Sequence, residues 1–281
     1  MRSRGRRTAA ALLVLGVLAL GGCGDQDSSE GTSRVDGLNG GNDESPPEPT
    51  PTHIERAPTA SPTYEPPELD RTQLDANLAA LSPDDRELVD HYLHARGDDR
   101  LGEGTWIVAA PMTVEEARLR LLGPDARPAT AADEGAMMNG NASAYSFLQV
   151  GDGVVAWEDT GFADPPKRLL AALSQGGAVS AVATDNIEAM TRFGYARDGE
   201  IVFDAFEYAF VDSLDEIPAE VRHLAALAWD DLEGPMVETA DWSAVAQAMS
   251  EKVTGVRATA AVQDVEEWYV VPLPWGVMED Y

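Results

Sequence analysis

Regular spacing of apolar residues begins at about residue 70, and the first elements it predicts are helices. Leu74, Leu78 and Leu81 lie three or four residues apart, which places them on one helix face. A second helix is predicted over 82–97, because a serine, a proline and two acids open this stretch and a glycine closes it. The capping-box sequence Thr113-Val-Glu-Glu116 predicts a third helix, which runs to Leu122.

Short runs rich in β-branched and aromatic residues predict seven strands, over 105–109, 145–150, 154–158, 178–183, 191–197, 200–206 and 268–271. Two pairs of these runs are separated by turn sequences. Gly151-Asp152-Gly153 joins one pair and Asp198-Gly199 joins the other, and both sequences are typical of tight β-hairpin connections. The sheet is therefore expected to be mainly antiparallel.

The hairpin at Asp198-Gly199 has apolar residues on both faces. A two-residue turn would place Arg197 opposite Glu200 and Tyr195 opposite Val202. Strands that are apolar on both faces are usually covered on both. We therefore expect this hairpin in the centre of the sheet.

The remaining segments complete an α+β pattern. Helices are expected over 165–174, 218–231 and 242–253, and the stretch 124–141, rich in alanine, glycine and proline, reads as a long loop. We therefore expect residues 70–281 to form a single α+β domain with a mainly antiparallel sheet packed against helices.

The first 22 residues have the pattern of an export signal. Four arginines precede an apolar stretch that ends at Leu20, which at about 12 residues is shorter than the ~20 that a membrane-spanning helix needs. The sequence Leu20-Gly-Gly-Cys23 then resembles the lipobox of bacterial lipoproteins. We expect residues 1–22 to be a lipoprotein signal peptide and Cys23 to carry the lipid. The general secretory route is favoured, although Arg6-Arg7 leaves the twin-arginine route open.

Residues 23–69 have the composition of a disordered tether. Eight prolines lie between Pro46 and Pro67, among threonines and acids, and such a stretch has too little apolar surface to fold. A flexible chain of this length would span roughly 35–40 Å. It would hold the domain away from the membrane. A proline-rich recognition motif around Pro46-Pro-Glu-Pro49 is the alternative reading.

Net charge limits the partners of the chain. The sequence has 49 acidic and 20 basic residues, a formal net charge of −29, and removal of the four signal-peptide arginines would make it more negative. Such a surface repels nucleic acids and anionic lipid headgroups. The charge favours solubility first, and then a cationic protein or peptide, or a divalent cation, as partner. The single cysteine excludes an intrachain disulfide and a cysteine-based zinc site.

Few residues offer recognisable chemistry. His91 and His94 are three apart on a predicted helix, but no third histidine or cysteine accompanies them, so no metal site is expected. Glu158 and Asp159 are candidate general acid and base residues, yet neighbours on a strand point to opposite faces. Trp275 is a candidate for contact with a carbohydrate or a partner. No nucleophile elbow, phosphate loop or dinucleotide motif is present, and no cofactor is expected.

A set of motifs runs from Trp106 to Phe206. They are the strand with Trp106, the helix 113–122 followed by Gly123, Val155-Ala-Trp157-Glu158 with Gly161-Phe162, Leu173-Ser174-x-Gly176-Gly177, and Phe193-x-Tyr195-x-x-Asp198-Gly199. As a set they resemble an uncharacterised bacterial domain family that is common in high-GC Gram-positive species. The resemblance implies a fold and no activity, because the members of that family have no known function.

Two hypotheses about function follow. The first is a membrane-anchored, extracytoplasmic lipoprotein at the outer face of the cytoplasmic membrane, whose domain is a non-enzymatic binding or interaction module. The second is a cell-envelope hydrolase-like enzyme that uses carboxylates such as Glu158. A pocket in which carboxylates converge would favour the enzyme.

Overall fold

The computed structural model describes residues 69–97, 101–186, 190–231, 234 and 237–272. All of them belong to one compact unit, Tyr64–Tyr281. The predicted signal peptide, Cys23, nearly all of the predicted tether and Trp275 lie outside the described residues. Within the described ranges, no helix is both long and apolar enough to cross a membrane.

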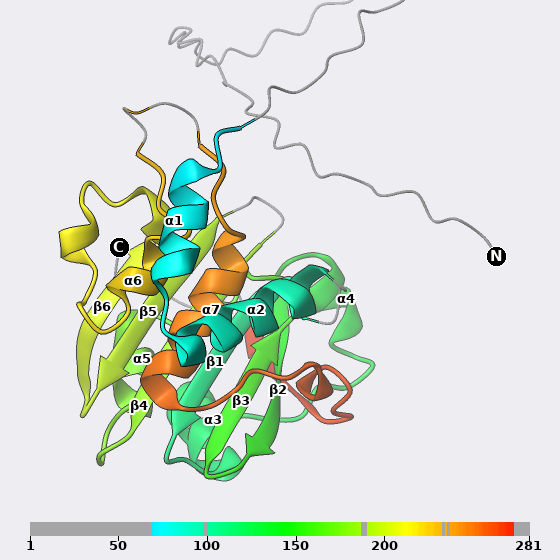
Figure 1. The fold of residues 1–281 in the computed structure, drawn as a ribbon. Helices are drawn as coiled ribbons and strands as arrows, with labels where there is room; N and C mark the ends of the chain where they lie inside the picture. Colours follow the sequence, from blue (N-terminus) through cyan, green and yellow to red (C-terminus); the bar gives the residue numbers. More distant parts are fainter. Residues whose placement is uncertain (1–68, 98–100, 187–189, 232–233, 235–236, 273–281) are drawn as a thin grey trace, which may run out of the picture. The chain divides into compact units, whose positions relative to one another are not determined.

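A seven-stranded sheet forms the centre of this unit (Figure 1), with the strand order β6-β5-β4-β1-β3-β2-β7 and antiparallel pairing throughout. Its strands are β1 (Gly104–Ala110), β2 (Ala142–Val150), β3 (Gly153–Glu158), β4 (Val179–Asp185), β5 (Thr191–Arg197), β6 (Glu200–Phe206) and β7 (Trp268–Pro272). The predicted α+β class and the antiparallel sheet are confirmed.

The α-helices among the described residues are α1 (Thr72–Ala80), α2 (Pro83–Gly97), α3 (Val114–Leu122), α4 (Glu134–Met138), α5 (Lys167–Leu173), α6 (Arg222–Ala225) and α7 (Trp242–Thr254). Three short 3₁₀ turns accompany them, at η1 (Tyr208–Phe210), η2 (Leu214–Glu216) and η3 (Ala260–Val262). Figure 1 shows α1, α2 and α7 in front of the sheet, whereas α3 and α5 lie behind it.

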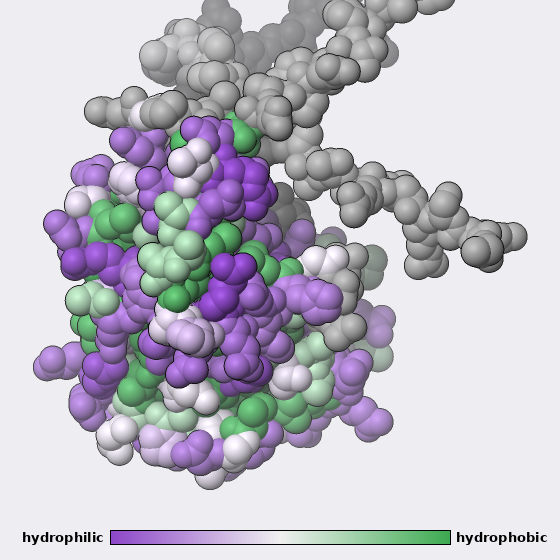
Figure 2. All heavy atoms as spheres, in the orientation of Figure 1, coloured by the Kyte–Doolittle hydropathy of each residue, from purple (hydrophilic) through white to green (hydrophobic). Residues whose placement is uncertain are grey.

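The front face of the sheet carries the larger core. Helix α7 packs directly on β4, β5 and β1, and α2 packs on α7. Every residue from Ser243 to Ser250 is buried, because α7 has the sheet on one side and α2 with α6 on the other. Leu88, Val89 and Tyr92 form the buried stripe of α2. Figure 2 shows mainly hydrophilic side chains over α2 and a patch of hydrophobic residues over part of α1.

The rear face carries a second, smaller core. Side chains from β1, β2, β3 and β4 meet α3 and α5 there, with Ile107, Phe147, Leu121 and Leu170 among the buried members. The two helices also contact one another. Both faces of the central strands are therefore covered, which explains why β1 reads as a continuous apolar run rather than an alternating one.

The residues predicted to cap the N-termini of two helices do so in the structure. Ser82 Oγ accepts a hydrogen bond from the Asp85 amide at 3.2 Å, as expected for an N-cap. Thr113 caps α3 in the same way, at 3.3 Å from the Glu116 amide. The Glu116 carboxylate, however, accepts a hydrogen bond from Arg120, so this side chain is committed to an i,i+4 ion pair.

Two segments differ from their predictions. The stretch 124–141, predicted as a loop, contains the five-residue helix α4. Helix 218–231 was predicted as continuous, whereas its only α-helical part is Arg222–Ala225, extended by turns. In both segments buried and exposed residues follow no long helical period, so tertiary contacts decide where a helical turn forms.

The hairpin β5–β6 is not central, and this prediction was wrong. Strand β6 is at one edge of the sheet. Arg197 pairs with Glu200 as predicted, but a bulge after Tyr195 places Tyr195 opposite Phe203 and leaves Val202 out of register. Val202 is 43% exposed. Bulges commonly interrupt the regular edge of a sheet and so oppose pairing with other chains.

Candidate functional site

One end of the rear face carries buried polar side chains in place of apolar ones. These residues, which we call the polar row, are Thr105, Ser143, Tyr145, Glu158, Thr184, Arg192 and Asp204. The pairings Thr105↔Glu158, Thr105↔Thr184 and Thr184↔Arg192 place neighbouring members side by side across the sheet. Directly paired residues share a face, so the row crosses from β2 to β6.

Glu158 accepts four hydrogen bonds in the row. Its side chain is fully buried at the end of β3. The carboxylate accepts hydrogen bonds from the hydroxyl groups of Ser143 and Thr160. It also accepts from two backbone amides, Thr160 at 3.1 Å and Gly161 at 2.8 Å. Both carboxylate oxygens are therefore used to hold the chain just beyond β3.

Arg192 is the centre of a second group of bonds in the row, and its side chain is fully buried. Its Nε and Nη2 atoms donate to the two Asp204 carboxylate oxygens at 2.8 and 2.7 Å, which is a bidentate pair. Its Nη1 donates to the Pro165 carbonyl at 2.8 Å and lies 3.5 Å from Asp164 Oδ1. Asp164 also accepts a hydrogen bond from the Thr184 hydroxyl.

Bonds from the polar row also reach the segment that connects β3 to α5, residues 159–166. Glu158 binds its beginning and Arg192 binds its end, while the Tyr145 hydroxyl donates to the Ala163 carbonyl in between. Ala163 and Asp164 are buried, although they belong to a connection without regular secondary structure. Side chains of the polar row thus form hydrogen bonds with backbone groups of a buried connection, which has no regular secondary structure to pair those groups.

Two glycines make room for this arrangement. Gly161 has a φ of +70°, and a Cβ there would lie 2.7 Å from the Asn186 Cβ and 2.9 Å from the Asp185 carbonyl oxygen. Gly194 pairs with Asp204, and a Cβ on Gly194 would lie 2.8 Å from Asp204 Oδ1. The Asp204 carboxylate can therefore reach Arg192 only because residue 194 has no side chain.

The charges of the row do not balance. Arg192 faces the carboxylates of Asp204 and Asp164, with Glu158 further along the row. Burial raises the pKa of Asp164 from 3.8 to about 6, because the loss of solvation outweighs the favourable effects of Arg192 and Thr184. The negative charges of Asp204 and Glu158 act in the same direction as burial. Burial likewise raises the pKa of the Tyr145 hydroxyl.

This raised pKa predicts a stability that falls as the pH rises. The unfolded chain loses the Asp164 proton near its ordinary pKa of 3.8, whereas the folded chain keeps it until about 6. Between these values the folded state binds more protons, so the free energy of unfolding decreases with pH by about 3 kcal/mol in total from this group. Asp164→Asn removes that contribution.

Urea unfolding of the wild type and of Asp164→Asn across this pH range measures the effect. The difference in free energy of unfolding between them should shift by about 3 kcal/mol in favour of the variant from the acidic to the neutral end. Titrating groups that do not interact with Asp164 are common to both proteins and cancel. A difference that stays constant with pH would contradict the assignment.

Glu158 and Asp159 do not converge, as the alternation of strand side chains predicts. Glu158 is buried in the polar row, whereas Asp159 is exposed. Glu158, Asp164 and Asp204 are the carboxylates that do approach one another, but all three side chains are buried and bonded to groups of the chain itself. Glu158 binds the connection 159–166 directly, Asp164 is part of it, and Asp204 holds Arg192, which binds its end.

His91 and His94 lie on the same face of α2, as their spacing predicts, and both line one cavity together with Arg257. Among the described residues, no group of three or more histidine, cysteine, aspartate or glutamate side chains is placed to hold a metal ion.

Sequence reasoning missed Asp164, Arg192 and Asp204. One signal was available, because Arg192 shares its strand face with Gly194 and Ala196, where a charged residue is out of place unless it has a buried partner. The identity of that partner depends on strand register and on the path of residues 159–166, which the sequence does not reveal.

The comparisons with known proteins give a family and no activity. No curated protein matches the chain, and no solved structure does. The chain does match the Family of unknown function (DUF6461) over residues 122–273. The match includes Glu158, Gly161, Asp164, Arg192 and Asp204, and extends beyond the Phe206 limit of the motifs recognised in the sequence, whereas Trp106 lies before it. Because the matched region spans more than half of the sequence, the chain belongs to this family of unknown function.

Proposed function

We propose that this chain is a lipoprotein held at the outer face of the cytoplasmic membrane through Cys23, and that its α+β domain is a binding module. The observation that carries the proposal is the position of Cys23, the single cysteine of 281 residues, directly after an apolar stretch and two glycines. An acidic, proline-rich stretch then separates it from the domain, as a tether would. The lipid would add a diacylglycerol anchor to an otherwise hydrophilic chain.

A binding module is preferred to an enzyme because of what the carboxylates do. Glu158, the sequence candidate for a catalytic acid, is committed to four hydrogen bonds within the chain. Asp159, the second candidate, is exposed and stands apart from it. The net charge of −29 favours a cationic protein or peptide as the partner of the module.

Replacement of Cys23 tests the anchor. In the Cys23→Ala variant no thiol is available for the lipid, so the chain should lose the added mass of the diacylglycerol group and should no longer be retained as a processed form in the membrane fraction. Mass spectrometry of membrane and soluble fractions, with and without detergent, measures both effects. Ser28→Ala, which changes the neighbouring tether and keeps Cys23, is the matched control and should behave as the wild type.

A wild-type chain that is found in the membrane without a lipid on Cys23 would contradict the proposal. So would a Cys23→Ala chain that is processed and retained to the same extent as the wild type.

A further inference from the structure

A small cavity of about 250 Å³ lies between α2 and the segment that follows α7. Its polar lining residues are His91, His94, Arg257 and Thr259. The rest of the lining is apolar and comes from Ala95, Leu101, Ala258 and Ala260. The three basic residues also line a wider, more open depression next to it, which places them at the entrance.

Two of these side chains have nitrogen atoms available for a ligand. Arg257 Nε donates to the Glu251 carboxylate at 2.9 and 3.0 Å, but within the described ranges neither Nη atom of Arg257 makes a hydrogen bond. The His91 ring packs edge-on against Tyr92, with centroids 4.9 Å apart, and neither of its nitrogens bonds to a described residue. Hydrogen-bonding groups at the rim of an apolar cavity are the usual means of orienting a small ligand.

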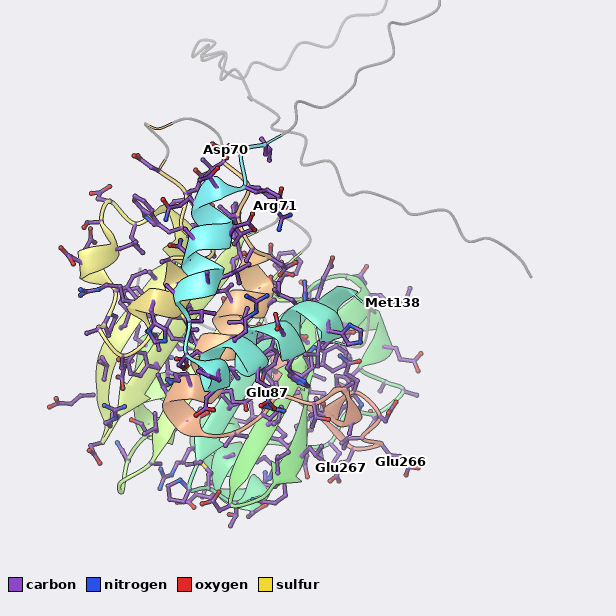
Figure 3. The ribbon with its side chains drawn as sticks, viewed as in Figure 1. Asp70, Arg71, Glu87, Met138, Glu266 and Glu267 are labelled. Atoms are coloured by element: carbon purple, nitrogen blue, oxygen red, sulfur yellow. The ribbon has the colours of Figure 1, made fainter. Side chains whose placement is uncertain are left out.

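The nearby acids are mostly engaged elsewhere. Glu251 is bonded to Arg257 and to the Tyr92 hydroxyl at 2.8 Å. Asp90 is paired with Arg86 at 3.0 Å. Glu87, which is labelled at α2 in Figure 3, lines the wider depression rather than the cavity, and its negative charge acts on both His91 and Arg257. In a chain with a net charge of −29, basic side chains thus gather at one cavity.

Electrostatics around His91 agree with this placement. The pKa of His91 is lowered first by burial and then by the positive charge of Arg257, and these effects outweigh the opposing ones of Glu251 and Glu87. A second positive charge is therefore disfavoured at this position in the free protein. A bound anion would remove the disadvantage, because it would pair with both cations at once.

We infer that this cavity binds a small carboxylate with a short apolar body, its carboxylate at Arg257 and His91 and its body against Leu101 and the alanines. The size fits this class, since cavities for drug-sized ligands begin at about 300 Å³. A polyanion would be repelled by the acidic surface around the cavity. Binding at this cavity does not depend on Cys23. The test of the lipid anchor and the test of the ligand site can therefore give independent results.

Histidine-selective NMR of the full chain tests the inference with butyrate as the probe. The chain contains four histidines, His53, His91, His94 and His223. Butyrate should shift the ring signals of His91 and His94 with saturation, and should leave those of His53 and His223 unchanged. Affinity should rise as the pH falls below neutral, because the pKa of His91 is lowered by burial and Arg257 in the free protein and the bound carboxylate favours its protonated form.

Butyramide, which has the same apolar body and no charge, is the ligand control and should bind at least about tenfold more weakly. Arg257→Gln should weaken butyrate binding by a similar factor. Arg197→Gln is the matched control variant, because Arg197 is equally exposed and also pairs with one glutamate, Glu220.

Three outcomes would overturn the inference. They are equal binding of butyrate and butyramide, shifts that do not saturate or that affect all four histidines alike, and equal weakening by Arg257→Gln and Arg197→Gln. The comparison of butyrate with butyramide uses the wild-type chain, so it decides the matter even where Arg257→Gln fails to fold.

Discussion

Arg192→Met should lower the free energy of unfolding by about 3–5 kcal/mol, the largest effect that we expect from a single change in this protein. The arginine is fully buried, and its removal leaves Asp204 without the partner of both its oxygens. It also leaves the Pro165 carbonyl without its donor. A buried carboxylate that loses its counter-charge must either remain ionised at a high free-energy cost or take up a proton. Urea unfolding at neutral pH measures the loss.

The neighbouring arginine of the same strand provides the control. Arg197 is 43% exposed and is paired with Glu220, so Arg197→Met should change the free energy of unfolding by at most about 1 kcal/mol. The double variant Arg192→Met with Asp204→Leu removes both charges of the buried pair and should recover much of the loss. A loss from Arg192→Met no larger than that from Arg197→Met would show that the pair contributes little.

Where Arg192→Met does not fold, Arg192→Lys decides the question. A lysine keeps the positive charge and has no planar fork, so it cannot bind both Asp204 oxygens and the Pro165 carbonyl together. The free energy of unfolding of this variant should be lower than that of the wild type, because part of the hydrogen bonding of Arg192 is lost. A value equal to that of the wild type would contradict the importance of the bidentate geometry.

The seven strands and the ends of the main helices could be predicted from local residue patterns. Ser82 and Thr113 are N-caps in the structure, and Arg197 lies opposite Glu200 at the Asp198-Gly199 turn. These features depend on residues close together in the sequence, which is why hairpins and caps are readable from it. The α+β class then follows from the order of the elements.

The position of a hairpin within the sheet could not be predicted in the same way. The apolar residues of β6 suggested burial on both faces, but the strand is at the edge, and its bulge leaves Val202 exposed. Phe203 meets Phe193 on the front face, with ring centroids 5.9 Å apart, while Asp204 turns to the polar row on the rear. An edge strand with a single neighbour can therefore carry apolar residues on both faces without being central.

The polar row could not be predicted from the sequence, for a related reason. Its members come from six strands, β1 to β6, and two of the partners of Arg192, Asp204 and Asp164, lie 12 and 28 positions away from it in the sequence. Only Glu158 was singled out, and it was considered for its chemistry rather than for its bonds to Thr160 and Gly161. Buried polar networks depend on strand register, and register is a property of the whole sheet.

At the cavity lined by His91, the sequence predicted part of the site. The two histidines could be recognised from their spacing, but the third basic residue of the cavity could not. The spacing of His91 and His94 placed both on one helix face, and they do share a cavity. The third basic residue, Arg257, follows α7 and reaches the site only because α7 packs against α2. A search for a third metal ligand could not find it, since arginine does not bind metals.

Glu158→Gln should lower the free energy of unfolding by about 2–4 kcal/mol, whereas Asp159→Asn should change it by less than about 0.5 kcal/mol. The two acids are neighbours in the sequence, and each substitution exchanges one oxygen for an amide. At Glu158 the Thr160 amide donates to Oε1 and the Gly161 amide to Oε2, so the new NH₂ group loses one of these two hydrogen bonds whichever oxygen it replaces. At Asp159 the side chain is exposed and water replaces any lost bond.

Hydrogen exchange locates the effect. The amides of Thr160 and Gly161 donate directly to the Glu158 carboxylate, so they should exchange faster in Glu158→Gln, and amides of α7 should not exchange faster by more than the global loss of stability allows. A catalytic carboxylate in an accessible site behaves differently, because its neutral replacement commonly leaves stability unchanged or raises it. A Glu158→Gln chain as stable as the wild type would therefore refute the structural role of Glu158 and would restore the carboxylate enzyme as the better explanation.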